Sequence, residues 1–511
     1  MNLNIDQNYA KALFQCTDKG GDDSVRRSDG FLDENEFLKF FLKLTFHFET
    51  GRVMSLYSSR NDKTFSAVDL KNFLIKVQQF EQVTISIADS IIREIITKQG
   101  NYRMARRENL LGPIGFRSLL RSRWGNILRS GHETVFQNMK RPLSDYYINS
   151  SHNTYLMGTQ IKVDVLDGPY GEPCITHRHT LVSSICLKDV LMAIKSYAFK
   201  YSEYPLILTI ENHCSLQQQQ ILGNDIFITS ENEPLTALPS PHELKFKYIL
   251  RGKTGLEYIS AQDENINTET SSISTFTVDP EISKLISLSQ VKLSQNWMND
   301  ITKHAVNLSP SISETKVRKI AASSARFTSY TSKHLVKSYP KALRQDSSNF
   351  NPMQSWMLGI QSVALNMQTH DENLDLNSGL FRINGNCGYV LKPDILLVGL
   401  DVEKNECFYR MIMNLTIISG EYLPKPFSKC GEIIDPYVIV EIYGIPEDCR
   451  KMQTKVIDNN GFCPVWNESF KFELKQPEVA ILRLCVKDHD NASLDDFIGE
   501  FSVPVNSIRP G

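Results

Sequence analysis

Short apolar runs that end in a histidine, an acid or an amide are the feature that most constrains how this chain can fold. The first run, 145–149, leads directly into Ser-Ser-His152-Asn153. Three later runs of the same kind deliver Asp167, His177 and Glu211. Because a parallel (β/α) barrel gathers its active-site side chains at the C-terminal ends of its strands, this repetition predicts such a barrel with its site at that end.

The side chains that these runs deliver suit phosphate-ester chemistry. The imidazole of His152 can stabilise charge on a phosphoryl oxygen, and the amide oxygen of Asn153 can bind a hard cation such as Ca²⁺. A His-Asn pair that stands alone after a strand is more often an ordinary strand-to-loop junction. The three later runs favour the catalytic interpretation.

Four longer motifs carry a resemblance to a known family. The runs SSHNTY, IENHCS, DSSNFNP and GYVLKP resemble the X and Y catalytic halves of eukaryotic phosphoinositide-specific phospholipase C, and they occur in the family's order. The resemblance covers nearly the whole chain and is greatest to the zeta-like or delta-like forms, here without a pleckstrin-homology domain. It implies a multidomain α+β protein with EF-hand-like helices, a split TIM-type (β/α)₈ barrel and a C2 β-sandwich.

The expected domains follow this order along the chain. They are an EF-hand-like helical region at 1–140, the X half of the barrel at 141–257, an X–Y linker at 258–283, the Y half at 284–395 and an incomplete C2 domain at 410–511. A chain of 511 residues is long enough for several domains, because single cores seldom exceed about 300 residues. The linker is polar, rich in Ser, Thr and Asn, and only mildly acidic.

Composition excludes several other classes of protein. A net charge of −2 argues against a nucleic-acid binder, which needs a broad basic surface. No apolar run approaches the roughly 20 residues of a membrane span, and the N-terminus shows no secretory signal. The ten cysteines form no C-x-x-C motif, so they indicate neither a zinc site nor a disulfide framework. These features predict a cytoplasmic protein with reduced thiols, and we expect a monomer.

Capping patterns predict helices in the N-terminal region. Asp33 can cap one helix, Ser66 and Asp69 form a capping-box pattern ahead of a second, and isoleucines recur through 87–96 in a third. The calcium-loop pattern D-x-[DN]-x-[DN]-G is absent after Asp18. We therefore expect a structural helix pair here rather than a metal site.

Strand patterns mark the Y half and the C-terminal region. Apolar runs predict strands at 325–328, 362–366 and 388–391. From about 410 the pattern changes to alternating strands, and IIDPYVIVEI, PVWNESFKFEL and LCVKDHDNASLDDFIGE resemble a C2 domain. Its loops gather four acids that suit Ca²⁺ and docking to anionic membranes, although clustered Asp in loops is often turn chemistry. These acids are Asp435, Asp488, Asp490 and Asp496.

The resemblance also implies roles for the barrel residues. Asn153, Asp164 and Glu211 would be Ca²⁺ ligands. His152 would stabilise the charged phosphoryl oxygens, and His177 would be the general acid that protonates the departing diacylglycerol oxygen.

A second set of residues would bind the inositol ring. Arg251, Lys253, Ser311 and Lys337 would contact ring phosphates, and Tyr339 would lie against the ring. The plainer alternatives are that Lys253 is a solvated surface residue and that Tyr339 belongs to the core.

Three departures from the family pattern bear on activity. Lys162 stands where the family has a metal-binding glutamate, which removes a ligand and adds repulsion against Ca²⁺. Only the eight residues Thr154–Ile161 separate the His-Asn motif from the next strand, whereas a parallel crossover needs a dozen or more. Lys337 replaces an arginine that would grip phosphate in two places.

The sequence therefore predicts Ca²⁺-dependent hydrolysis of phosphatidylinositol 4,5-bisphosphate to inositol 1,4,5-trisphosphate and diacylglycerol in calcium signalling. The protein would be recruited peripherally from the cytoplasm to anionic membranes. The alternative is a weakly active or inactive phosphoinositide-binding scaffold of the same family, which Lys162 and the short connection favour. A membrane adaptor driven by the C2 region would explain only the last hundred residues.

Overall fold

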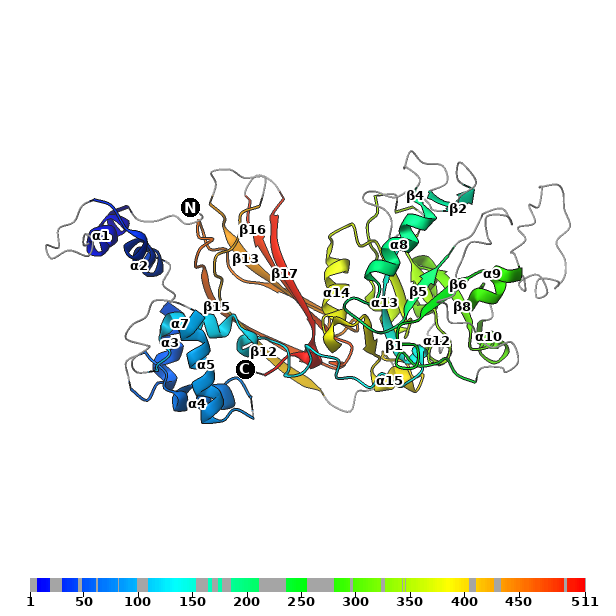
Figure 1. The fold of residues 1–511 in the computed structure, drawn as a ribbon, viewed down its shortest axis with the longest axis horizontal. Coiled ribbons are helices and arrows are strands. Elements are labelled where there is room, and N and C mark those ends of the chain that lie inside the picture. Colours follow the sequence, from blue (N-terminus) through cyan, green and yellow to red (C-terminus); the bar gives the residue numbers. More distant parts are fainter. Residues whose placement is uncertain are drawn as a thin grey trace.

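The computed structural model describes residues 7–18, 30–44, 48–60, 63–80, 82–98, 109–152, 164–167, 173–176, 185–210, 236–254, 280–294, 297–322, 327–341, 343–344, 346–403, 410–426, 433–490 and 494–510. Figure 1 shows N-terminal helices at one end, a sandwich of long strands in the middle and an α/β region at the other end. Within these ranges, no helix is long and apolar enough to cross a bilayer.

The N-terminal helices are confirmed, and so are two of the predicted caps. They are α1 (Gln7–Thr17), α2 (Glu34–Leu44), α3 (Phe48–Tyr57), α4 (Ala67–Lys76), α5 (Ile85–Lys98) and α7 (Pro113–Leu120). The Asp33 carboxylate accepts a hydrogen bond of 2.7 Å from the backbone N–H of Glu36, and Ser66 and Asp69 form a complete capping box ahead of α4. Most of the loop after Asp18 lies outside the described residues.

One eight-stranded sheet forms the barrel. Its order is β11-β1-β10-β9-β8-β7-β6-β5. The strands are β1 (Tyr146–Ser151), β5 (Leu206–Thr209), β6 (Tyr248–Gly252), β7 (Ile286–Val291), β8 (Leu308–Ser313), β9 (Lys337–Tyr339), β10 (Ser362–Leu365) and β11 (Tyr389–Leu391). All neighbours are parallel except β11, which is antiparallel to β1. The carboxyl ends of β1 and of β5 to β10 therefore share one end of the barrel.

The runs before Asp167 and His177 do not join this sheet. They form a separate antiparallel sheet of β2 (Asp164–Asp167), β3 (Pro173–Thr176) and β4 (Ile185–Cys186). The expectation that both runs are parallel barrel strands is therefore wrong. Within the described residues no strand pairs with the outer edge of β5, and the eight residues after the His-Asn motif are too few for a crossover that could supply one.

Helices lie between the strands of this region along the chain. They are α8 (Leu187–Tyr197), α9 (Pro280–Leu285), α10 (Trp297–Lys303), α11 (Glu314–Ala322), α12 (Phe327–Thr331), α13 (Met353–Met357), α14 (Glu372–Phe381) and α15 (Asp394–Leu397). The strand predicted at 325–328 is wrong for its described part, because Phe327 and Thr328 begin α12. Phe327 and Tyr330 lie one helical turn apart and are both fully buried, so packing overrides their β propensity.

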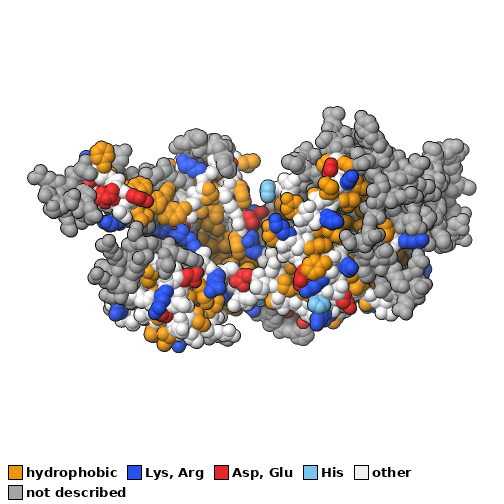
Figure 2. Space-filling view, viewed as in Figure 1, with side chains coloured by type: hydrophobic (Ala, Val, Ile, Leu, Met, Phe, Trp, Pro, Cys, Tyr) orange, Lys and Arg blue, Asp and Glu red, His pale blue; other side chains and the backbone are white. Residues whose placement is uncertain are grey.

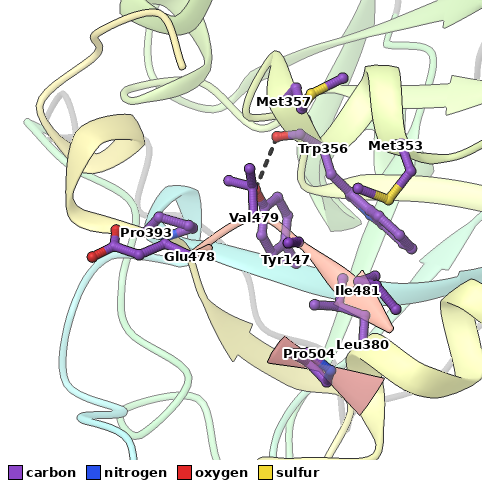
Figure 3. A pocket seen from close by; sticks show the side chains of 11 residues that line it. Tyr147, Met353, Trp356, Met357, Leu380, Pro393, Glu478, Val479, Ile481 and Pro504 are labelled. Atoms are coloured by element: carbon purple, nitrogen blue, oxygen red, sulfur yellow. Dashed lines mark hydrogen bonds between the residues drawn. The ribbon is translucent and has the colours of Figure 1, made fainter. Parts of the chain in front are cut away.

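The C-terminal strands form two sheets. Strands β14 (Arg450–Gln453), β13 (Pro436–Tyr443), β16 (Ile481–Asp488) and β17 (Asp496–Pro504) make one, and β12 (Met411–Ser419) and β15 (Val465–Leu474) make the other. One apolar core runs from the barrel into this sandwich. Figure 3 shows the seam, where Tyr147 and Trp356 of the barrel face Ile481 and Pro504 of the sandwich.

Charged contacts reinforce the seam between barrel and sandwich. Arg483 of β16 pairs with Asp375 of α14 at 2.8 Å and also with Glu441 of β13, and all three side chains are largely buried. Figure 2 shows acidic and basic side chains side by side between the sandwich and the α/β region. These contacts fix the barrel and the sandwich to each other.

Candidate active site

The predicted barrel residues are described unequally. His152, Arg251, Ser311 and Lys337 have described side chains, as do Lys253 and Tyr339. Asn153, His177 and Glu211 lie outside the described residues, and only the backbone of Asp164 is described.

His152 lies at the carboxyl end of β1 and is held there by β10. Its backbone N–H donates to the carbonyl oxygen of Leu365 at 2.7 Å, and its ring Nδ1 lies 3.0 Å from Oδ1 of Asn366. Burial has the largest effect on the pKa of His152. Against the opposing effect of the Asn366 hydrogen bond, burial and the nearby Lys337 together lower this pKa to about 4. The imidazole is therefore neutral at physiological pH.

Asn366 fixes which ring nitrogen of His152 carries the proton. Its amide nitrogen donates to the carbonyl oxygen of Ser347 at 3.0 Å, so its amide oxygen faces the ring. An amide oxygen only accepts, and Nδ1 of His152 must then be the donor. The other ring nitrogen, Nε2, remains as the acceptor.

The DSSNFNP segment holds Asn366 in this orientation. The side-chain oxygen of Asn349 accepts the backbone N–H of Asn366 at 2.7 Å, and Asn349 is held in turn by Asp371, which caps α14. Sequence reasoning used this segment only for the resemblance and assigned no role to Asn349 or Asn366. An asparagine at the end of a predicted barrel strand was the signal in the sequence that could have revealed the role of Asn366.

Arg251 crosses the interior of the barrel. It extends from β6 across β7 to β8, where it donates to Oγ and the carbonyl oxygen of Ser309, both at 2.8 Å, and to Oγ of Ser311 at 2.7 Å. Its side chain is only 2% exposed, and its remaining terminal nitrogen, Nη1, has no hydrogen-bond partner among the described residues. Burial lowers the pKa of Arg251 to about 10, which still leaves it charged at neutral pH.

No acidic side chain of the described residues pairs with the Arg251 guanidinium. Its three contacts are a carbonyl and two hydroxyls, which are neutral. A buried cation without a counter-ion is costly, and an anion that enters the barrel would offset that cost.

Lys337 extends the row of side chains that Arg251 and Ser311 form across the barrel strands. The register pairs Lys337 of β9 with Ser311 of β8 on one side and with Ser362 of β10 on the other. Ser362 in turn makes a 2.8 Å hydrogen bond to Ser150, two residues before His152. The row thus brings Arg251, Lys337 and His152 to one interior surface, where they can bind an anion.

The remaining two ring contacts are less enclosed. The Lys253 side chain is exposed just beyond the end of β6, and Tyr339 is half-buried at the end of β9, opposite Ser313. Neither position distinguishes a ligand contact from its plainer alternative, so both roles stay predictions.

The small antiparallel sheet gives the backbone position of one other predicted residue, Asp164. Asp164 of β2 is the direct partner of Thr176 of β3, and Thr176 immediately precedes His177. The sheet therefore places the Asp164 position beside the start of the segment that carries His177.

The acids of the sandwich gather at one end of the four-stranded sheet. The backbone N–H of Asp435 donates to the Asp488 carboxylate at 2.7 Å, and Asp488 and Asp496 are register partners. The neighbouring Asp495, which sequence reasoning passed over, accepts from the backbone of Asp490 and from the Tyr437 hydroxyl. Tyr437 thereby holds Asp495 at this end.

The distances between the predicted donor residues and the types of their donor atoms bear on whether they could hold a resident metal ion. In the described parts of the chain, no three His, Cys, Asp or Glu side chains converge closely enough to hold a metal ion. The donors expected in the barrel are hard oxygens of the kind that Ca²⁺ prefers. Only the Asp164 position among them is described, and it lies opposite Thr176 in the small antiparallel sheet.

Three family models match the chain. The model of the phosphatidylinositol-specific phospholipase C X domain matches residues 139–164 and 160–254, that of the Y domain matches 282–395, and that of the C2 domain matches 411–511. The X match falls into two pieces that overlap at 160–164, at the end of the short Thr154–Ile161 connection.

Curated relatives align with all or nearly all of the chain. The 1-phosphatidylinositol 4,5-bisphosphate phosphodiesterase delta-4 of Xenopus laevis is 34% identical over 570 residues, which cover 100% of this chain and 74% of that protein. The human delta-4 protein is 34% identical over 579 residues with the same coverage. The inactive phospholipase C-like protein 2 of Mus musculus is 34% identical over 558 residues, which cover 98% of this chain and 48% of that protein.

Solved structures share the arrangement of domains. The crystal structures of PLC21 from L. pealei and S. officinalis are 28% identical to this chain, with TM-scores of 0.76 and 0.77. Each alignment covers 100% of this chain and 71% of the PLC21 chain. The chain therefore belongs to the phosphoinositide-specific phospholipase C family.

Proposed function

We propose that this chain hydrolyses phosphatidylinositol 4,5-bisphosphate at the open end of its barrel. The products would be inositol 1,4,5-trisphosphate and diacylglycerol, as for the relatives whose names specify a phosphodiesterase for this lipid. The single observation that carries the proposal is the buried Arg251, which has no acidic partner among the described residues and an unpartnered Nη1.

A ring phosphate would supply the missing counter-ion of Arg251. Hydrogen bonds between a guanidinium and a phosphate are charge-assisted and about twice as strong as neutral ones. Ser311 already lies 2.7 Å from Arg251, and its register partner is Lys337. These three side chains would therefore bind the phosphorylated ring as one unit.

His152 would act on the phosphodiester itself. Its Nδ1–H donates to Asn366, so only Nε2 can take up a further proton. Nε2 would be protonated only when a negatively charged group binds nearby. Binding of the phosphodiester would raise the pKa of His152 and turn Nε2 into a donor toward the phosphoryl oxygens. Substrate binding should then be coupled to proton uptake, which burial prevents in the unbound protein.

The remaining chemistry would come from residues that the sequence places at the same end. The ring 2-hydroxyl would attack the phosphorus to form a cyclic phosphodiester while His177 protonates the departing diacylglycerol oxygen. Water would then open the cyclic phosphodiester to give inositol 1,4,5-trisphosphate. Asn153, Asp164 and Glu211 would hold Ca²⁺, which stabilises negative charge on the reacting phosphate when it is bound. Lys162, in place of a further carboxylate, would weaken that metal's binding.

The sandwich would bring the barrel to its substrate. We infer that Asp435, Asp488, Asp490 and Asp496 close around Ca²⁺ at an anionic membrane surface, because in this structure no three of these carboxylates lie close enough together to hold the ion. Tyr437 would hold Asp495 beside them. Because the sandwich shares a core with the barrel, membrane attachment would fix the orientation of the barrel as well. This proposal includes peripheral recruitment from the cytoplasm and a monomeric protein.

Lipid turnover by the full chain tests the proposal. Phosphatidylinositol 4,5-bisphosphate in detergent micelles is incubated with the wild type and with His152→Ala, with free Ca²⁺ buffered. We expect water-soluble inositol trisphosphate from the wild type and none from the variant. Equal release by both proteins would remove His152 from the mechanism.

A scaffold without turnover is the second candidate, and specific observations favour it. An inactive relative aligns with 98% of this chain, the outer edge of β5 has no partner strand among the described residues, and Lys162 replaces a metal-binding carboxylate. A scaffold would bind inositol trisphosphate through Arg251 and yet release no product. Binding without turnover at any Ca²⁺ concentration would establish it.

A further inference from the structure

Two cysteines are direct cross-strand partners in the small antiparallel sheet. The register of β3 and β4 pairs Cys174 with Cys186 and Ile175 with Ile185. Direct antiparallel partners have Cα atoms about 4.5 or about 5.5 Å apart, and a disulfide spans roughly 4.4–6.8 Å between Cα atoms. The register therefore brings the backbone of these two positions within the Cα separation that a disulfide spans.

No other strand register in the described residues pairs two cysteines. Cys16 and Cys449 are exposed and far apart in the sequence, while Cys387 and Cys485 are buried. Cys186 is half-buried and is the N-cap residue of the 11-residue helix α8, where its side chain makes no capping hydrogen bond. It lies where a small oxidant can reach it.

We propose that Cys174 and Cys186 form a reversible disulfide when the protein meets a hydroperoxide. The sulfur of Cys186 would attack one peroxide oxygen, the O–O bond would break, and a sulfenic acid and one water would form. The sulfur of Cys174 would then attack the sulfenic sulfur, so that the S–S bond forms and the second water leaves. Two thiols lose two electrons and two protons, and hydrogen peroxide is reduced to two waters.

The disulfide would tie together segments that the proposed chemistry uses. β3 ends at Thr176, one residue before His177, and Thr176 is the register partner of Asp164. A link from Cys174 to Cys186 would anchor that strand to the start of α8. We expect the tie to restrict how His177 adjusts to the leaving oxygen and so to lower turnover. Only this consequence rests on the proposed function.

Peptide mapping tests the bond without any need for activity. Trypsin cleaves after Lys162, Arg178 and Lys188, so the two cysteines fall in the separate peptides 163–178 and 179–188. The full chain is treated with stoichiometric hydrogen peroxide, alkylated, and digested without reductant. We expect the two peptides joined as one species, which dithiothreitol separates.

Matched variants establish which thiols are involved. Cys186→Ser should abolish the joined species, whereas Cys449→Ser, which removes an exposed cysteine, should leave it intact. Separately alkylated peptides at a peroxide dose that oxidises Cys449 would overturn the proposal. So would a joined species that contains any other cysteine.

Turnover of the same samples tests the consequence. Oxidised wild type should hydrolyse lipid at least threefold more slowly, dithiothreitol should restore the rate, and Cys186→Ser should not respond to peroxide. A joined species with unchanged turnover would refute the effect on His177. Absence of turnover in both oxidised and reduced protein would instead count against the proposed function and leave the disulfide standing.

Discussion

Replacing Arg251 by methionine should separate ligand binding from stability. Arg251→Met keeps an unbranched apolar side chain in the barrel and removes the buried charge. The wild-type guanidinium makes three hydrogen bonds of 2.7–2.8 Å, each worth roughly 1–3 kcal/mol, and its desolvation costs several kcal/mol. These effects nearly cancel, so we expect the free energy of unfolding to change by less than about 2 kcal/mol in either direction.

The same substitution should weaken ligand binding strongly. A charge-assisted hydrogen bond to phosphate contributes roughly 1.5–3 kcal/mol, and each 1.4 kcal/mol is about a tenfold change in affinity. Loss of the contact between Arg251 and a ring phosphate should therefore raise the Kd for inositol 1,4,5-trisphosphate by roughly 10- to 150-fold.

Two measurements on the same samples test this reasoning. Isothermal titration with inositol 1,4,5-trisphosphate gives the Kd, and urea denaturation gives the free energy of unfolding. Arg93→Met is the control, because Arg93 is an exposed arginine of α5 whose side chain is 71% exposed. Wild-type affinity in Arg251→Met, together with a loss of stability above about 3 kcal/mol, would show that Arg251 only supports the barrel.

Three further predictions concern the neighbourhood of this site. Asn366→Ala should lower lipid turnover at least tenfold, because nothing then orients the His152 ring; the micelle assay checks this against Asn414→Ala on an exposed position of β12. Between pH 6.5 and pH 4, His152 binds a proton in the unfolded state but not in the folded state. As the pH falls through this range, the free energy of unfolding should therefore decrease on the order of 3 kcal/mol more in the wild type than in His152→Gln, which urea denaturation would measure. Equal pH dependence in both proteins would contradict the burial argument. Lys162→Glu alone should raise Ca²⁺-dependent turnover less than threefold. A family-like helix and strand with that glutamate, inserted ahead of Asp164, should raise turnover much more. Full recovery of turnover by the single substitution would contradict this prediction.

The sequence predicted the parts of the fold that local patterns determine. The caps at Asp33 and Ser66 and the strand at 362–366 depend on residues close together in the chain, and the structure confirms them. The helix at Phe327 was mistaken for a strand because its aromatic and β-branched residues favour strands, whereas burial against the barrel core decides its structure.

The site was predicted in part for the same reason. His152 follows its strand as expected, because a strand end can be recognised locally. The role of Asn366 could not be seen, since its contacts with His152 and Ser347 join positions up to 214 residues apart. The pairing of Cys174 with Cys186 could not be predicted either, because the spacing of cysteines along the chain does not determine strand register.

Direct measurement of lipid hydrolysis by the unmodified 511-residue chain tests the central claim. Radiolabelled phosphatidylinositol 4,5-bisphosphate is presented in mixed micelles across a range of free Ca²⁺, beside His177→Ala. We predict Ca²⁺-dependent release of inositol trisphosphate that His177→Ala abolishes, at a rate reduced by Lys162 and the short Thr154–Ile161 connection. No release at any Ca²⁺ concentration, in a protein that still binds inositol trisphosphate, would contradict the enzymatic account and identify the chain as a scaffold.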